Sequence, residues 1–242
     1  MIVVDQPDAL MDVPVAIELR EFTPHQAVTV TATQIFPSHS RWQAHATFMT
    51  DESGAVGIAR QAPISGSYEG VAAMGLIWSA ERVLAPSPPM PDDWVLQPSF
   101  IHFEAVGPSD QRAELTITRR SAGPGVTRRV IRVDGLMGIL FLPPGEGPHP
   151  SVLILHGGGG GMDEYSGAML ASRGYAAFNL AYFAEPGLPR VSSIFRWNIS
   201  NTRSAGCGRS PGCATVFWPL GGHRAAANSR CCSAPLFRIS MP

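Results

Sequence analysis

A histidine followed by five glycines is the feature of this sequence that most directly suggests chemistry. In the stretch "LILHGGGGGMDEY" (153–165), an apolar run ends at His156 and a loop of bare backbone follows. Two backbone N–H groups aimed at one spot stabilise the negative charge on a carbonyl oxygen under attack, and losing one such donor typically costs ~3 kcal/mol of activation free energy. Glycine suits this role because it allows close approach and positive φ. We therefore predict oxyanion-hole donors at Gly157, Gly158 and Gly159.

Two other uses of a glycine-rich loop compete with this hypothesis. A phosphate-binding P-loop ends in Gly-Lys-Ser or Gly-Lys-Thr, and this sequence contains no lysine. A flexible turn without a chemical role is the alternative that the local pattern leaves open. The neighbouring His156 is expected to hold the loop through a backbone hydrogen bond rather than to act as a catalytic base.

The elements on either side of the loop predict an α/β arrangement. Residues 151–155 form a continuous apolar run, which is typical of a strand buried on both faces. Asp163 is a good helix N-cap, and the helix it starts should run to about Arg173 and end at Gly174. Residues 175–182 predict a second buried strand, which a right-handed crossover places parallel to the first.

The residues before this unit, from ~10 to ~132, predict a β-sandwich. Alternation of apolar and polar residues predicts short strands, and they cover residues 13–20, 26–33, 42–49, 99–106 and 112–118. Asp134-Gly135 predicts a hairpin between residues 128–133 and the apolar run that follows, because both positions of a type I′ turn need φ > 0. No long helix is expected in this region.

Several conspicuous side chains in the sandwich region are expected to have structural roles. We place Trp42, Trp78 and Trp94 in the core or at its rim, and we take His45 and His102 as structural residues of strands. The pairs Arg119-Arg120 and Arg128-Arg129 can meet the phosphates of a nucleotide-like ligand. Since they alternate with apolar residues, we expect a solvated strand face instead.

Length and charge exclude some classes of function. The chain has 242 residues, 45% of them hydrophobic, and a formal net charge of −1, so no overall field attracts nucleic acid or an anionic membrane. Its longest apolar runs are far shorter than the ~18 residues of a membrane span. The acidic N-terminus lacks the basic start of a signal peptide. We therefore expect a cytoplasmic protein with no nucleic-acid partner and no membrane span.

The composition changes abruptly after about residue 190. Residues 191–242 contain no Asp or Glu, six arginines, and all four cysteines of the chain (Cys207, Cys213, Cys231 and Cys232). No hydrophobic period is sustained there, so we expect a disordered tail. The spacing of these cysteines around His223 matches no zinc finger, and nothing indicates secretion. We therefore expect no metal site, no cofactor and no disulfide.

Residues ~13 to ~190 resemble the family of acyl-CoA thioesterases and bile acid-CoA:amino acid N-acyltransferases. The matching segments are "QAHATFMTDESGAVGIARQAPISGSYEGVAAMGLIWSA" (43–80), "GILFLPPGEGPHPSVLI" (138–154) and "HGGGGGMDEYSGAMLASRGYAAFNLAYF" (156–183). The resemblance implies an N-terminal immunoglobulin-like sandwich (10–135) followed by the first part of an α/β-hydrolase domain (136–190). For intact members it implies an acyl-CoA substrate, which is hydrolysed by a Ser-His-Asp triad or transferred to an amino acid by a Cys nucleophile.

The nucleophile that the resemblance implies is missing from this sequence. Its elbow, Gly-x-Ser-x-Gly or the Cys form, occurs nowhere in the chain. "GCGRSPGCA" (206–214) comes nearest, but no apolar strand precedes it, and Pro211 after Ser210 has no N–H for the oxyanion hole. No acidic residue follows Glu185 to orient a catalytic histidine. We assign no catalytic residue and expect this chain to be inactive as a thioesterase.

A displaced reading frame accounts for the tail. With one choice of codons, "SSIFRWNIS" (192–200) read two nucleotides later gives V-D-I-P-L-E-Y-F, which resembles the helix that the family has there. The same offset turns "GHRAAANSRCC" (222–232) into P-S-R-G-G-E-L-A-L-L, and the preceding codon can encode glycine. That product is a Gly-x-Ser-x-Gly elbow entering a helix. We predict a frameshift near codon 191.

The alternative function is a non-catalytic β-sandwich binding module.

Overall fold

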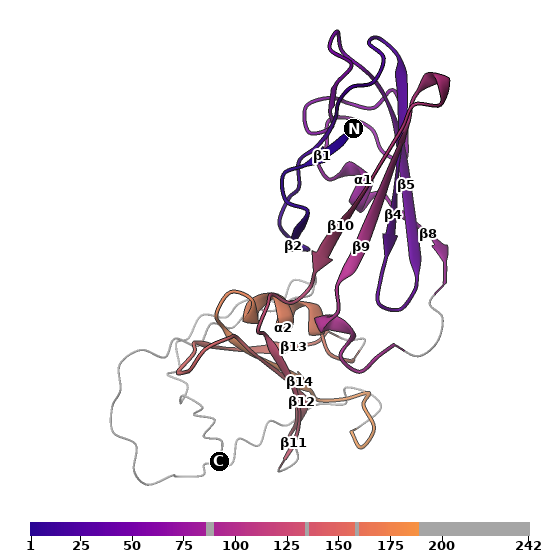
Figure 1. Cartoon of the computed structure of the whole chain (residues 1–242). Helices are drawn as coiled ribbons and strands as arrows, with labels where there is room; N and C mark the ends of the chain where they lie inside the picture. Colours follow the sequence, from indigo (N-terminus) through magenta and orange to yellow (C-terminus); the bar gives the residue numbers. More distant parts are fainter. Residues whose placement is uncertain (86–89, 134–135, 158–159, 189–242) are drawn as a thin grey trace, which may run out of the picture. The chain divides into compact units, whose positions relative to one another are not determined.

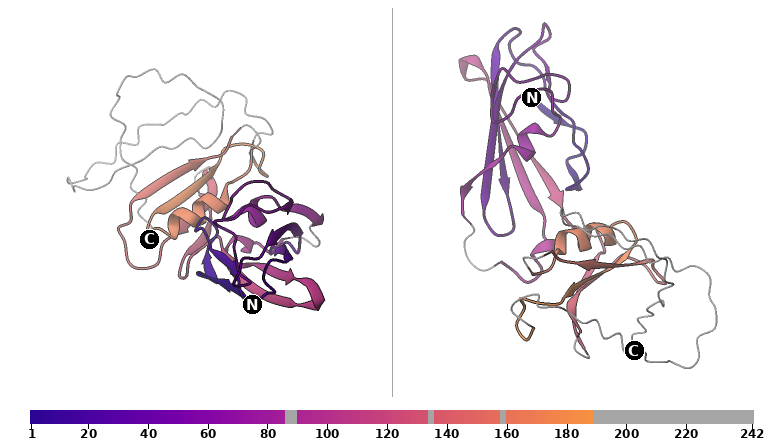
Figure 2. Two further views of the ribbon diagram at one scale, coloured as in Figure 1. Left: turned by 90° about the horizontal axis from the view of Figure 1, so that it is seen from above. Right: turned by 180° about the vertical axis from the view of Figure 1, so that it is seen from behind.

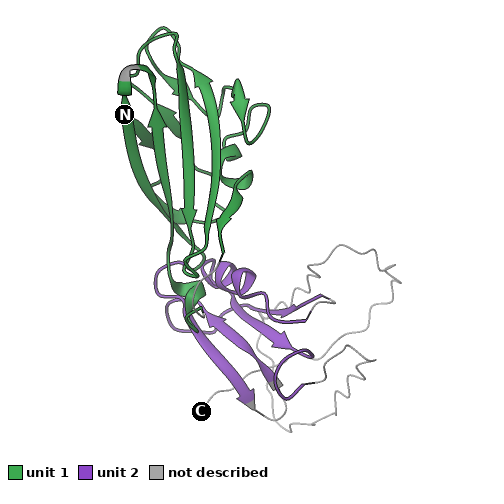
Figure 3. Ribbon diagram, turned by 90° about the vertical axis from the view of Figure 1, so that its right-hand side faces the viewer, with its two compact units in different colours: residues 1–122 green, residues 123–242 purple. Residues whose placement is uncertain are grey.

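The computed structural model describes residues 1–85, 90–133, 136–157 and 160–188. The chain divides into two compact units, Met1–Ala122 (unit 1) and Gly123–Pro242 (unit 2), shown in green and purple in Figure 3. The tail from residue 191, with its four cysteines and His223, lies outside the described residues. The expected disorder of that tail therefore stays a prediction.

The regular secondary structure of unit 1 is almost entirely β-strand, arranged in two sheets. The small sheet has the order β1-β3-β6 and is formed by Ile2–Val4, Ile17–Leu19 and Val56–Gly57. The large sheet has the order β2-β10-β9-β4-β5-β7, with β8 also paired to β5. Its strands are Asp8–Leu10 (β2), Arg112–Arg120 (β10), Ser99–Val106 (β9), Ala27–Ile35 (β4), Arg41–Met49 (β5), Ser65–Gly66 (β7) and Glu81–Leu84 (β8). Figure 1 shows the long strands β4, β5, β9 and β10 side by side.

Alternation along the long strands builds the core of unit 1. Val28 of β4 pairs with Phe48 of β5, and Val30 pairs with Ala46, with all four side chains fully buried. The threonines between them point to the other face and are only half-buried, so one face of the sheet is apolar. Residues of the small sheet join the same core, which is compatible with a β-sandwich.

The predicted long strands are confirmed, whereas the short elements of unit 1 were not predicted. The strand expected over 13–20 is reduced to β3. The elements that the sequence did not indicate are β1, β2, β6, β7, β8, helix α1 (Gly75–Trp78) and the 3₁₀ turns Trp94–Leu96 and Pro108–Asp110. None of the three tryptophans lies in the core, and Trp78 is 64% exposed, which places it beyond the expected rim.

The expectation of a solvated face is wrong for Arg119. Its side chain lies in β10 and only 2% of the residue is exposed. Nη2 donates hydrogen bonds to the carbonyl oxygens of Met11 (2.9 Å) and Val13 (2.6 Å). The adjacent Arg120 points to the other face, where it forms a bidentate ion pair with Asp8 at 2.7 Å and stays partly exposed. The two neighbouring arginines therefore have opposite environments.

The described part of unit 2 is a four-stranded sheet with one helix. The strand order is β11-β12-β14-β13, formed by Thr127–Val133, Leu136–Leu142, Ala176–Ala181 and Ser151–Leu155. The predicted hairpin is confirmed, since Val133 of β11 pairs with Leu136 of β12. β11 falls within the expected sandwich region 10–135 but pairs in the sheet of unit 2, so the compact units meet earlier in the chain, between Ala122 and Gly123.

The β–loop–α–β arrangement predicted around the glycines is present in unit 2. β13 and β14 are parallel, and helix α2 (Glu164–Ala171) connects them and packs against β12 and β14 (Figure 2). Asp163 caps the helix by accepting from the Ser166 N–H at 3.1 Å. Gly174 has φ 90°, as expected of a glycine after a helix. The order, type and capping of these elements were all predictable from the sequence.

An ion pair fastens α2 to the sheet of unit 2. Arg128 of β11 donates from Nε to Glu164 Oε2 at 2.6 Å and from Nη2 to Oε1 at 3.1 Å. The two side chains are only 13% and 12% exposed, so the solvated face expected for Arg128 is also wrong. Bidentate pairing of this kind gives geometric specificity as well as energy. Glu164 stands in the first turn of α2, where a negative charge also favours the helix dipole.

Candidate functional site

The glycine loop lies at the carboxyl end of β13, between that strand and the start of α2. Ligand sites in parallel α/β sheets occur at the carboxyl ends of strands, where loops leave the sheet. Because β14 is parallel to β13, the residues that follow β14 leave the sheet on the same side. The loop and residues 182–184 are therefore neighbours, although twenty or more positions separate them in the chain.

Two hydrogen bonds hold the start of the loop. The hydroxyl group of Tyr182 donates to the carbonyl oxygen of His156. Nδ1 of His156 lies 3.2 Å from the carbonyl oxygen of Gly157, which agrees with the backbone-holding role expected for this histidine. Tyr182 was not singled out from the sequence. The signal that identifies it is its position directly after the strand that is parallel to β13.

The described glycines of the loop are not equivalent. An added Cβ at Gly157 would meet no atom of the described residues within 4 Å, and the residue itself is exposed. Gly160 has φ 73°, and its N–H donates to the carbonyl oxygen of Gly157 at 3.2 Å. A Cβ at Gly160 would lie 2.5 Å from Cβ of Ala184 and 3.1 Å from the ring of Phe183. Gly157 is thus accessible, while Gly160 is a packing position.

Gly158 and Gly159, the other predicted oxyanion-hole donors, lie outside the described residues. The direction of their N–H groups therefore stays a prediction, as does the convergence of three donors on one spot. The structure places Gly157 at an accessible position, with the loop closed behind it by the turn to Gly160.

The N-terminus of the adjacent helix α2 is not available to stabilise a bound anion. Asp163 and Glu164 occupy the start of α2, so two carboxylates already offset the positive end of its dipole. The carboxylate of Asp163 accepts from both the backbone N–H and the hydroxyl group of Ser166. Burial raises the pKa of the Tyr165 hydroxyl above its ordinary value, so this side chain carries no charge at pH 7. An anion at the site would therefore depend on the N–H groups of the loop.

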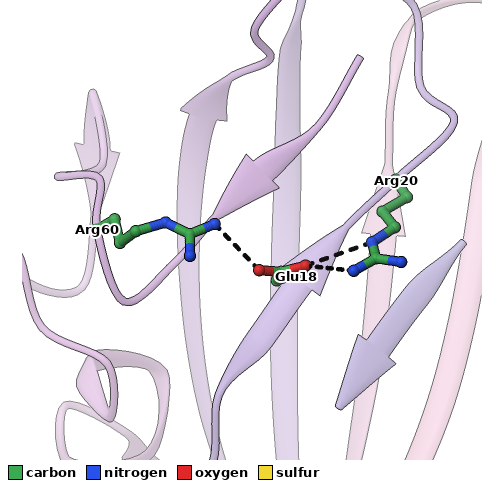
Figure 4. Close-up of polar contacts among 3 residues, drawn as sticks. All are labelled: Glu18, Arg20 and Arg60. Atoms are coloured by element: carbon green, nitrogen blue, oxygen red, sulfur yellow. Dashed lines mark hydrogen bonds and ion pairs between the residues drawn. The ribbon is translucent and has the colours of Figure 1, made fainter. Parts of the chain in front are cut away.

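A second group of charged side chains lies in unit 1 but has the character of a surface cluster. Glu18 of β3 accepts from Arg20 at 2.8 Å and from Arg60 at 3.0 Å (Figure 4). Hydrogen bonds from Arg20, and then from Arg60, hold the pKa of the Glu18 carboxyl below its ordinary value. Each positive charge is thus partnered by the carboxylate between them, and exposed pairs of this kind contribute little.

Features expected from other classes of site can be checked over the described residues. No group of three or more His, Cys, Asp or Glu side chains is arranged there to hold a metal ion. Within the same residues, no helix has the length and apolar character needed to cross a membrane. Ser210, the nearest sequence approach to an elbow serine, lies in the part of the chain that the structure does not describe.

Comparison with known proteins supports the resemblance read from the sequence. The family model for the "Acyl-CoA thioester hydrolase/BAAT N-terminal region" matches residues 12–133. Acyl-coenzyme A amino acid N-acyltransferase 2 of Rattus norvegicus is 36% identical over 193 residues, which cover 76% of this chain and 46% of that protein. Bile acid-CoA:amino acid N-acyltransferase of Mus musculus is 35% identical over 190 residues, covering 75% and 45%.

A thioesterase is similar to the same extent. Acyl-coenzyme A thioesterase 2, mitochondrial, of Rattus norvegicus is 33% identical over 196 residues, which cover 76% of this chain and 42% of that protein. These alignments are too long to be contained in residues 12–133, so the similarity continues into unit 2. The chain spans less than half the length of these relatives.

Proposed function

Because this chain belongs to the acyl-CoA thioester hydrolase and BAAT family, we propose that it consists of an immunoglobulin-like sandwich and the first part of an α/β-hydrolase domain. Because β11 pairs in the sheet of unit 2, the sandwich expected over residues 10–135 is proposed to end at about residue 122, and the hydrolase part is proposed to extend from there to residue 190. The parallel pair β13 and β14, joined through α2, supports the second assignment. The substrate class proposed for the intact protein is an acyl-CoA thioester, as the names of its relatives suggest.

The accessible backbone of Gly157 is the observation that carries this proposal. In the proposed reaction a serine attacks the thioester carbonyl, a histidine accepts the serine proton, and an aspartate orients the histidine. The carbonyl oxygen becomes negatively charged and accepts hydrogen bonds from the N–H groups of Gly157, Gly158 and Gly159. Tyr182 and Gly160 contribute by fixing the loop that carries these donors.

We further propose that this chain has no thioesterase activity, because the elbow serine and the acidic triad residue are missing from its sequence. A frameshift near codon 191 is the proposed cause. Sequencing the gene downstream of codon 190 tests it directly. Codons that yield no Gly-x-Ser-x-Gly elbow in either alternative frame, around the codons of His223 and Arg224, would end this explanation.

Release of CoA thiol from palmitoyl-CoA tests the activity. The chain as it stands should give no release proportional to protein concentration. Protein expressed from a gene with the frame restored should give steady release, and changing its elbow serine to alanine should reduce kcat by at least ~10³-fold. Activity of the present chain would overturn the proposed inactivity. An inactive but folded product of the restored frame would overturn the proposed reaction.

The role of the loop has its own pair of variants in the restored protein. Gly157→Pro removes the N–H and should lower kcat by ~10²–10³-fold. Gly157→Ala keeps the N–H, so its kcat should fall much less than that of Gly157→Pro. Equal losses in both variants would show that the loop acts by shape and not by donating a hydrogen bond.

A non-catalytic binding module is the second candidate. Its support is the core of unit 1, whose buried residues all come from residues 2–117 and therefore need nothing from unit 2. A stable, monodisperse fragment 1–122 that captures a specific partner would favour this function. The cellular location proposed for either function is the cytoplasm, although two relatives are named as mitochondrial.

A further inference from the structure

Unit 1 contains a cavity of about 220 Å³ that the proposed reaction does not use. Most of its wall is apolar and is formed by Met11, Phe36, Ile77, Phe100 and Ile101. Arg119 contributes to the same wall although only 2% of this residue is exposed. An arginine buried beside an apolar cavity is unusual, because charged residues are rarely buried without a partner of opposite charge.

The charge of Arg119 is only partly satisfied within unit 1. Its Nη2 donates to two carbonyl oxygens, those of Met11 and Val13, which carry no net negative charge. Its Nη1 is buried and has no hydrogen-bond partner among the described residues. Among the described residues no ion pair of Arg119 with a carboxylate is found; burial lowers the pKa of its guanidinium group, and the charge of Asp12 offsets part of this effect. The neighbouring Arg120, in contrast, has Asp8 as a bidentate partner.

We propose that this cavity binds a small carboxylate with an apolar body, whose carboxylate group pairs with Arg119. Both N–H groups of Nη2 are already donated, so a ligand carboxylate would accept a charge-assisted hydrogen bond from the unused Nη1. The apolar wall is suited to a hydrocarbon chain or ring. Gln34 also lines the cavity, but its side-chain amide already donates a hydrogen bond to the carbonyl oxygen of Ile77 at 2.6 Å. Arg119 is therefore the residue proposed to bind the carboxylate.

The size of the cavity limits the ligand. An apolar cavity of ~150 Å³ holds one benzene molecule, so a cavity of about 220 Å³ suits a ligand only slightly larger. Hexanoate and benzoate have this size, whereas a long-chain fatty acid does not fit completely. This site is independent of the proposed thioester reaction, since every residue that lines it belongs to unit 1.

Calorimetric titration of the full chain with hexanoate at pH 7 tests the proposal. Hexanoate is ionised at that pH and should bind saturably to one site per chain. Hexanamide has nearly the same shape without the charge and should bind at least tenfold more weakly. No saturable hexanoate binding at millimolar concentration, or equal affinity for hexanamide, would overturn the site.

Two arginines in neighbouring positions provide a matched control. Arg119→Met should lower the affinity for hexanoate at least tenfold, and Arg120→Met should change it less than twofold, because Arg120 points to the other face and does not line the cavity. Equal losses in the two variants would contradict a role for the buried guanidinium group.

A third variant keeps the proposal testable if Arg119→Met does not fold. Ile77 is a partly buried residue of the cavity wall, so Ile77→Phe should fill part of the space and leave Arg119 in place. It should abolish the binding of both hexanoate and hexanamide, while circular dichroism confirms that the chain is folded. Unchanged hexanoate affinity in this variant would exclude the cavity as the binding site.

Discussion

The two units differ in how their apolar side chains are covered. In unit 1 the two sheets share one core, and the central strands of the large sheet have a partner on each side. In the described part of unit 2, β11 and β13 each have a partner on one side only, and α2 is the single helix that packs on the sheet. A sheet of this kind is complete only when further elements cover it. From this comparison we expect unit 1 to fold without unit 2.

The largest expected effect is the loss of a buried phenylalanine in unit 1. Phe103 of β9 is fully buried, so Phe103→Ala should lower the free energy of unfolding of unit 1 by ~3–5 kcal/mol. Phe141→Ala, a matched change at a fully buried position of β12, should affect unit 2 instead. Hydrogen exchange measured by mass spectrometry should locate each loss in its own unit. Loss of protection in both units from either change would contradict separate cores.

Breaking the Arg128–Glu164 ion pair should have the next largest effect. Removing one partner leaves the other charge largely buried, which costs ~3 kcal/mol or somewhat less at this exposure. Arg128→Met should therefore increase hydrogen exchange in α2 and β11 while β4 and β5 keep their protection. Arg129→Met on the same strand is the control and should have a smaller effect.

A crowded glycine tests how closely α2 approaches the sheet. An added Cβ at Gly167 would lie 2.3 Å from Nδ2 of Asn179 and 2.6 Å from Cδ2 of Phe141. Gly167→Ala should destabilise unit 2 by ~1–3 kcal/mol, as overpacking typically does. Gly157→Ala adds the same methyl group in open space and should be nearly neutral. Chemical denaturation followed by circular dichroism distinguishes the two variants.

The smallest effect concerns the Asp8–Arg120 pair of unit 1. A hydrogen bond from Arg120 holds the pKa of the Asp8 carboxyl below its ordinary value, so the pair stabilises the folded state above that value and is lost as the pH falls through the lowered pKa. Exposed pairs contribute ~0.2–1 kcal/mol. Arg120→Met should therefore reduce Tm slightly at pH 7 and not at pH 2. An equal reduction at both values would show that lost packing, and not charge, is responsible.

Sequence predicted the elements whose pattern is long and local. β4, β5, β9 and β10 were predictable because alternation over eight or nine residues reveals a half-buried strand. The strands of two to four residues have no such period, since they exist only through pairing with distant partners. The burial of Arg119 could not be predicted because its carbonyl acceptors lie more than one hundred positions away.

The candidate site was predictable in part for the same reason. Gly157 and the helix cap at Asp163 follow from a local pattern of residues 151–174. Tyr182 depends on β14 lying parallel to β13, and the packing role of Gly160 depends on Phe183 and Ala184 reaching the loop. These contacts join residues that are far apart in the sequence, so the run of five glycines by itself does not reveal them.

The unequal glycines of the loop have a practical consequence for enzyme engineering. A combinatorial library that randomises the whole loop would consist mostly of misfolded members, because any side chain at Gly160 collides with Ala184 and any non-glycine residue there must adopt φ 73°. Diversity is better concentrated at Gly157, where new side chains point into unoccupied space. Variants at this position would then be compared on a scaffold that stays intact.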